Sequence, residues 1–333
     1  MATAKLFTPR KLVAGGLLLL ILGILATFPH YGLPAYYTLL LGTIFMFTIL
    51  AVSWAMFSGP TGYMSLAPAA FFGVGIYTLA LLCSQWRQLL PLPVAVIAGG
   101  LVSFVLAFIV GMITLRLKGI YFTIFTFGLV LLLREIVVYW ELHIIGTRGQ
   151  YVSWASNQTV YYIMLGVLVA TLLTAYFIKR SRLGLAMESI GGNEAAAAHM
   201  GVNTTMVKVL SFAISAFFMG AAGAALAPRL IYVDPGISFN VLYSFMPILM
   251  AVFGGMGTLY GPVIGGVLFA YLERTLRLQW SSYFMLGFGI ILIAVVLFLP
   301  GGVAGLIPKL QNILRRVVSR LRKGDQAEQH ANT

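Results

Sequence analysis

Long apolar runs, joined by short polar links, follow one another along almost the whole chain. A helix of about 20 apolar residues is long enough to cross the hydrocarbon core of a bilayer. Only 9% of the 333 residues are charged, against about 25% in a soluble domain. A water-soluble fold could not cover its surface with so few charges, so the chain is predicted to be an all-α polytopic membrane protein. The clear runs are residues 11–28, 36–56, 93–115, 120–140, 159–178, 206–227 and 281–299.

Three shorter apolar pieces, residues 67–82, 241–253 and 263–276, are each bordered by Gly or Pro. If every piece crosses the membrane, the chain has about ten transmembrane helices. If some are half-helices that meet inside the membrane, the number is about nine to eleven. No A-x-A-like cleavage site follows the first run, so residues 11–28 are predicted to be an uncleaved helix rather than a signal peptide.

The basic residues indicate how the chain is oriented. The 21 Lys and Arg residues cluster at the ends of apolar runs, and such residues are in excess on the cytoplasmic side of membrane proteins. Placing both termini in the cytoplasm puts most of them there. The net charge of +13 is thereby explained without a nucleic-acid partner. The chain divides into an N-terminal cytoplasmic segment with the first transmembrane helix (1–36), a membrane core (37–300) and a basic cytoplasmic tail (301–333).

Two glycine-rich runs interrupt the apolar pattern, and neither matches a nucleotide site. The run "FGGMGTLYGP", residues 253–262, lacks the lysine of a P-loop. It also lacks the βαβ unit and the acidic partner that accompany a dinucleotide fingerprint. A second run, "SGPTGYMSLAP", residues 58–68, shares with it a G-x-x-G pair followed by hydroxyl residues and a proline.

These two runs have two possible explanations, and the sequence leaves both open. Gly- and Pro-interrupted segments at corresponding places in two halves of a chain are typical of broken helices at a transport site. Small residues also allow helices to pack closely without any substrate. In the first interpretation, the candidate residues of the substrate pathway are Gly59, Gly62, Ser65, Gly254, Gly255, Gly257 and Thr258.

The one long polar segment inside the core, residues 179–208, is predicted to form two short cytoplasmic helices. Ser181 can cap the first, in which Leu183, Met187 and Ile190 share one face. Asn193 can cap the second, "EAAAAHM". Helices this short are marginal in water, so the segment either docks on a partner surface or is an ordinary solvated loop.

Taken together, these motifs resemble the membrane permeases of ABC importers for branched-chain amino acids, a group that also contains ribose-type sugar permeases. The resemblance covers residues 37–300. It rests on "GPTGYMSLAPAAFFGVGIY", "LRLKGIYFTIFTFG", "SRLGLAMESIGGNEAAAAHMGVN" and "GGMGTLYGPVIGG", in this order. Tyr63 stands where many members have glutamine. The resemblance implies a fold of the type II importer kind, with no ATP site and no cofactor of its own.

The resemblance also implies the partners and the place of the protein. These are a homologous permease subunit, two cytoplasmic ATP-binding subunits and a periplasmic solute-binding protein, in a bacterial inner membrane. Branched-chain or other hydrophobic amino acids are the expected substrates, with urea, short amides and small organic acids as alternatives. In this interpretation the residues that couple the permease to the ATPase are Arg182, Glu188, Asn193, Glu194, Ala197 and Gly201.

Two other classes of protein fit less well. An intramembrane enzyme would need a Ser–His, paired-Asp or His–Glu arrangement at membrane depth, and the chain has only eight acidic residues and four histidines. A secondary transporter would need intramembrane acidic or His residues, or a sodium site, for its coupling. The single cysteine, Cys83, excludes an intrachain disulfide and a thiolate metal cluster.

Overall fold

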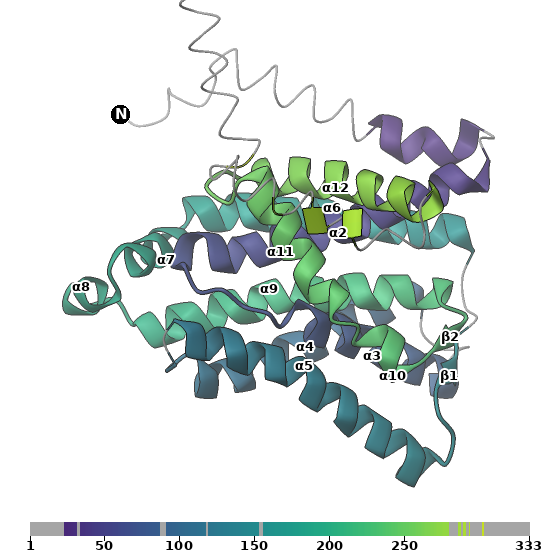
Figure 1. Cartoon of the computed structure of the whole chain (residues 1–333), viewed down its shortest axis with the longest axis horizontal. Coiled ribbons are helices and arrows are strands. Elements are labelled where there is room, and N and C mark those ends of the chain that lie inside the picture. The colour runs from purple at the N-terminus through teal and green to yellow at the C-terminus, as the bar shows by residue number, and fades with distance from the viewer. Residues whose placement is uncertain are drawn as a thin grey trace, which may run out of the picture.

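The computed structural model describes residues 23–31, 34–86, 91–117, 119–152 and 156–279, with single positions between 286 and 302. Most of its long helices run roughly side by side, and one of them, α11 (Leu242–Gly254), runs across the others, as Figure 1 shows. The long helices are α2 (Ala35–Thr61), α3 (Pro68–Trp86), α4 (Leu92–Thr114), α5 (Ile120–Trp140), α6 (Asn157–Arg180), α9 (Thr204–Leu226), α11 (Leu242–Gly254) and α12 (Gly261–Gln279).

Short elements lie at the two ends of this bundle. Helices α7 and α8 lie at one end, on the left of Figure 1, and strands β1 and β2 lie at the other. We call these the α7–α8 end and the ribbon end. The short elements are η1 (Phe28–Tyr31), the π-helix η2 (Glu141–Ile145), β1 (Gln150–Tyr151), α7 (Arg182–Gly192), α8 (Glu194–His199), η3 (Ala227–Arg229), β2 (Tyr232–Val233) and α10 (Pro235–Ser238).

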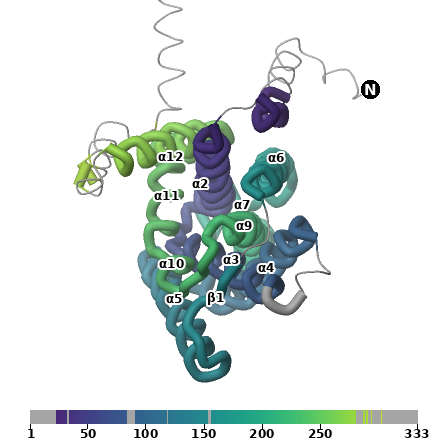
Figure 2. The backbone as a smooth tube through the Cα atoms, turned by 90° about the vertical axis from the view of Figure 1, so that its right-hand side faces the viewer, coloured from purple at the N-terminus to yellow at the C-terminus, as the bar shows by residue number. Residues whose placement is uncertain are grey.

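Helices α2 and α9 form the centre of the bundle, as Figure 2 shows in a view along their axes. Each contains an apolar stretch of 18 residues, and 78% of that stretch is buried inside the protein. In the span that contains α5, the buried share is 22%. A helix that is apolar on all sides is stable either in a protein core or in lipid. The outward faces of α4 and α5 carry large apolar side chains, such as Ile113 and Ile124, which suit a lipid environment.

Small residues allow α3, α4 and α9 to pack closely. A Cβ atom on Gly75 would overlap the carbonyl oxygen of Gly220, and one on Gly223 would overlap that of Phe72. Close backbone approach at small residues is a common way for helices to associate in membranes. Aromatic rings fill the space beside this crossing, with Phe212 5.1 Å from Phe57 and 5.3 Å from Phe71 between ring centroids.

The structure confirms most of the predicted membrane helices within the described residues. Predicted runs 36–56, 93–115, 120–140, 159–178 and 206–227 are all long apolar helices, and the shorter pieces correspond to α3, α11 and α12. Most of run 11–28 and most of run 281–299 lie outside the described residues. The tail 301–333 also lies outside them, except for Gly302. Within the part of the chain that the structure describes, six stretches are long and apolar enough to cross a membrane: Ala35–Thr61, Leu92–Thr114, Ile120–Ile145, Asn157–Arg180, Thr204–Arg229 and Pro235–Gly254.

A small antiparallel ribbon joins two loops that the sequence analysis left without structure. Gln150 pairs with Val233, and Tyr151 pairs with Tyr232. Arg148 Nε also donates to Asp234 Oδ2 at 3.1 Å. The ribbon thus connects the loop after η2 to the loop after η3, and it is the one departure from the predicted all-α fold among the described residues.

Candidate functional site

The first glycine run breaks the membrane core with a stretch of extended chain. Helix α2 ends at Thr61, and Gly62 caps it in the left-handed conformation, with φ of 71°. Residues 62–67 form no regular structure before α3 begins at Pro68. The indole N–H of Trp54 donates to the carbonyl oxygen of Ser65 at 2.7 Å. Since Trp54 lies about two turns before the end of α2, the segment runs back alongside α2 into the protein.

Side chains of α5 hold this extended segment. The Thr123 hydroxyl donates to the Met64 carbonyl oxygen at 2.9 Å, and the Leu66 N–H donates to Thr126 Oγ1 at 3.0 Å. Irregular backbone survives at membrane depth only if its polar groups find partners in protein or water. These hydroxyls satisfy backbone groups that a helix would have paired internally.

Ser244 of α11 holds the same segment from the other side. Its hydroxyl donates to the Leu66 carbonyl oxygen at 2.8 Å and accepts from the Ala69 N–H at 3.1 Å. Ser65 Oγ accepts from the Ala67 N–H at 3.2 Å. Ser65, a predicted pathway residue, is therefore buried and engaged with its own backbone. No sequence pattern pointed to Thr123 or Ser244 as residues that hold this segment.

The second glycine run is a tight crossing between α11 and α12. A Cβ atom on Gly254 would overlap the carbonyl oxygen of Gly261, and Gly255 has a φ of 101°, which favours glycine. Gly257 has free space around it. Thr258 Oγ1 accepts from the Gly261 N–H at 3.1 Å and so caps the start of α12. Gly254 thus serves close packing, one of the two alternatives that the sequence left open.

The two glycine runs meet at the α7–α8 end. A Cβ atom on Gly59 would lie 3.2 Å from the carbonyl oxygen of Met256. A cavity of about 300 Å³ opens beside this contact, between α2, α6, α7 and the second run. Of the predicted pathway residues, Gly59, Gly257 and Thr258 line it. The structure does not bring Gly62, Ser65, Gly254 or Gly255 to its wall.

The polar segment 179–208 forms the two short helices that the sequence predicts. Ser181 Oγ accepts from the Gly184 N–H at 3.3 Å, and Asn193 Oδ1 accepts from the Ala196 N–H at 3.1 Å. Met187 and Ile190 of α7 are buried, as their shared face predicts. A Cβ atom on Gly191 would overlap the carbonyl oxygen of Pro60. Helix α7 therefore docks on the first glycine run of its own chain.

The structure corrects the expected contact face of α8. Ala197 is fully buried within the chain, so it cannot be the surface that meets a partner. The exposed residues are its neighbours Ala195, Ala196 and Ala198. The error arose because four consecutive alanines carry no pattern that tells one face from another. Arg182 and Glu188 of α7 are exposed, and Gly201 follows α8 with a φ of 85°.

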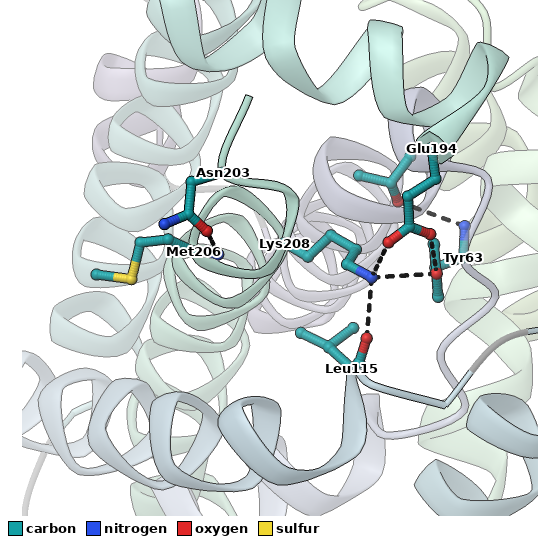
Figure 3. A network of polar contacts seen from close by, with 7 residues as sticks. Tyr63, Leu115, Glu194, Asn203, Met206 and Lys208 are labelled. Atoms are coloured by element: carbon teal, nitrogen blue, oxygen red, sulfur yellow. Dashed lines mark hydrogen bonds and ion pairs between the residues drawn. The ribbon is translucent and has the colours of Figure 1, made fainter. Parts of the chain in front are cut away.

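A buried lysine organises the base of α8, as Figure 3 shows. Lys208 Nζ lies 2.6 Å from Glu194 Oε1 and donates to the Leu115 carbonyl oxygen at 2.9 Å and to the Tyr63 hydroxyl at 3.1 Å. Tyr63 in turn donates to Glu194 Oε2 at 2.6 Å. A tyrosine hydroxyl is neutral near pH 7, so Tyr63 can donate to Glu194 and accept from Lys208 at the same time.

This network changes the interpretation of Glu194 and adds a residue that the sequence analysis missed. Glu194 was expected to couple the permease to the ATPase, but its carboxylate bonds to Lys208 and Tyr63 of its own chain. Lys208 was counted only as one of the 21 basic residues that indicate the orientation. Its position inside the predicted run 206–227 could have indicated this network, because a charge within an apolar span requires a partner.

Comparisons with known proteins give a family match over most of the chain. The family model "Branched-chain amino acid transport system / permease component" matches residues 36–296. The high-affinity branched-chain amino acid transport system permease protein LivM of Salmonella typhimurium is 27% identical over 85% of this chain and 72% of its own length. LivM of Escherichia coli K12 is 26% identical over the same shares.

A more distant relative matches over a shorter region. The ribose import permease protein RbsC of Haemophilus influenzae is 31% identical over 37% of this chain and 40% of its own length. No solved structure matches the chain.

Proposed function

The chain belongs to the family of branched-chain amino acid transport system permease components, and we propose that it forms the membrane path for branched-chain or other hydrophobic amino acids. It is a transport subunit of an ATP-driven ABC importer rather than an enzyme, and separate subunits hydrolyse the ATP. A periplasmic binding protein delivers the substrate. The chain has about ten transmembrane helices of the type II importer kind in a bacterial inner membrane. The names of the LivM relatives support this substrate class.

The observation that carries the proposal is the meeting of both glycine runs with α7 at one end of the bundle. Gly191 of α7 contacts Pro60 of the first run, while Glu188 of α7 and Gly257 of the second run line one cavity. A movement imposed on α7 and α8 from outside the chain therefore reaches both breaks in the helices. An external ATPase needs this arrangement to open and close a path.

A second permease subunit completes the path beside the first glycine run. Met64 is 51% exposed, and Tyr121 and Phe245 nearby are also exposed. Lipid cannot cover irregular backbone at membrane depth, whereas protein or a water-filled path can. We place the homologous subunit of a heterodimer against this side. The first break then faces the path between the two subunits.

The ATP-binding subunits dock on the outer face of α7 and α8. This face combines the small residues Ala195 and Ala198 with the exposed apolar side chains of Leu185 and Met200. Exposed apolar patches next to polar residues mark protein interaction sites. The small alanines let a partner surface approach closely.

The test is ATP-driven uptake by the reconstituted complex of both permeases, the ATPases and the binding protein. Wild-type proteoliposomes should accumulate leucine with ATP and should continue when proton and sodium gradients are collapsed. Ala198→Arg should prevent the ATPases from co-purifying and should abolish uptake, because the added side chain projects from the docking face. Gln158→Arg, an equal change at an exposed position near the ribbon end, should have no effect.

Three results would count against the proposal. Uptake that requires an ion gradient and not ATP would indicate a secondary transporter. Normal ATPase binding in Ala198→Arg would show that this segment is an ordinary solvated loop and not a docking surface. Uptake of urea, short amides or organic acids in place of leucine would change the substrate class and leave the transport role intact.

The proposed orientation places the α7–α8 end and both termini in the cytoplasm. Tyr151 in the ribbon is 80% exposed, and His199 of α8 is exposed at the opposite end. A cysteine at position 151 should react with a membrane-impermeant reagent added outside the cell, and one at position 199 should react only after the membrane is opened. The native Cys83 is buried and gives little background. Labelling of position 199 in intact cells would reverse the orientation.

A further inference from the structure

We propose that Tyr63, Glu194 and Lys208 form a latch between α8 and the first glycine run, which makes ATP hydrolysis productive. The proposal rests on the proposed function. It assigns these residues a positioning role. When α8 moves, the latch pulls on residues 62–67. If the latch is lost, the ATPases still hydrolyse ATP, but the transport path does not open and close.

One ammonium group joins four parts of the chain in this latch. Lys208 comes from α9, Glu194 from α8, Tyr63 from the segment 62–67, and the Leu115 carbonyl from the end of α4 (Figure 3). A lysine ammonium has three hydrogen-bond donors, and these three contacts use all of them. Lys208 is only 3% exposed, so water cannot readily replace a lost partner.

The bonds within the latch are strong enough to transmit a pull. Glu194 makes a 2.6 Å bond to Lys208 and another 2.6 Å bond to Tyr63. Hydrogen bonds in which the donor or the acceptor is ionised are about twice as strong as neutral ones. Helix α8 cannot move away from the bundle without breaking both bonds or carrying Tyr63 and the end of the Lys208 side chain along. Tyr63 therefore follows α8 at a lower free-energy cost than separation.

Two glycines permit this motion on either side of the latch. Gly62 precedes Tyr63, and Gly201 lies between Glu194 and Lys208, with φ values of 71° and 85°. Neither would meet another atom within 4 Å if a Cβ were added, so both have room to turn. The backbone can thus bend next to the bonded residues while the bonds stay intact.

The alternative explanation is that the three residues only stabilise the fold. An apolar replacement distinguishes the two, because exchanging a buried ion pair for hydrophobic residues of similar volume is often neutral for stability. The double variant Glu194→Leu with Lys208→Met keeps the packing and removes the charges. Tyr63→Phe removes one hydroxyl and leaves the ring, which lies 5.6 Å from that of Phe122.

The experiment measures leucine uptake and ATP hydrolysis in the same proteoliposomes, with the complete complex and its binding protein. Its readout is the amount of leucine transported per ATP hydrolysed. Both latch variants should assemble and hydrolyse ATP, and this ratio should fall about tenfold, as expected for the loss of a hydrogen bond to a charged group. Arg180→Met removes an exposed cation that lies over the Tyr176 ring, and its ratio should stay at the wild-type value.

Each outcome supports or overturns the proposal. A lower ratio in assembled latch variants supports a role in coupling. An unchanged ratio, with uptake and hydrolysis equal to wild type or reduced in parallel, shows that the residues only stabilise the fold. Failure of the double variant to assemble, together with a normal ratio in Tyr63→Phe, also overturns the latch. If the wild-type complex shows no ATP-driven uptake, the proposed function itself is wrong.

Discussion

Gly254→Leu is expected to prevent stable assembly of the protein. Any Cβ at this position would overlap the carbonyl oxygen of Gly261 and would lie 3.0 Å from the Gly265 N–H nitrogen. Overpacking a core side chain costs about 1–3 kcal/mol and sometimes more. Here the cost should exceed that range, since the obstructing atoms belong to the backbone of α12 and cannot rotate away. Size-exclusion chromatography of the detergent-solubilised protein after stepwise heating measures the loss.

Gly257→Leu provides the matched control for this prediction. The same substitution falls three residues later in the same glycine run, where a Cβ atom meets nothing within 4 Å. This variant should assemble and melt like the wild type, while its side chain narrows the cavity that Gly257 lines and lowers uptake. Normal assembly of Gly254→Leu would show that the crossing of α11 and α12 tolerates separation. Normal uptake by Gly257→Leu would exclude the cavity from the transport path.

The double variant Thr126→Val with Ser244→Ala is expected to release the extended segment 62–67. Together these hydroxyls serve the N–H and carbonyl of Leu66 and the N–H of Ala69. Each buried group that loses its partner costs about 1–3 kcal/mol. The free energy of unfolding should therefore fall by the sum of these costs over the three groups. We expect a much lower melting temperature and no measurable uptake.

Thr123→Val is the control for the released segment. Its hydroxyl also bonds to this segment, at the Met64 carbonyl oxygen, but the contact lies at an exposed position. Water can replace that partner, so the melting temperature should change little. If the double variant is as stable as Thr123→Val, hydroxyls do not hold residues 62–67. The segment would then depend on apolar packing alone.

Local rules of sequence predicted the helices and caps well. Ser181 and Asn193 cap α7 and α8 as expected, because an N-cap bond joins residues only three positions apart. The membrane helices also follow from local composition, since each must match the thickness of the same bilayer. These features depend on neighbouring residues and need no knowledge of the fold.

The contacts that shape the candidate site depend on residues far apart in sequence. Tyr63 and Glu194 are separated by 131 residues, and no short pattern indicates that they meet. The burial of Ala197 follows from where α8 docks, which its four alanines do not reveal. The glycine runs were recognised, yet their chemistry leaves both packing and pathway open. The structure places Gly261 against Gly254, and this contact shows that Gly254 serves close packing.

The hydroxyls that hold residues 62–67 also constrain the order in which the protein is made. Thr126 follows Leu66 by 60 residues, and Ser244 follows it by 178. At about 5–20 residues per second of synthesis, Ser244 emerges roughly 9–36 s after the backbone groups that it serves. During that interval the lipid cannot satisfy those groups. The nascent segment must therefore stay in the aqueous vestibule of the insertion machinery, or against a chaperone, until α11 arrives.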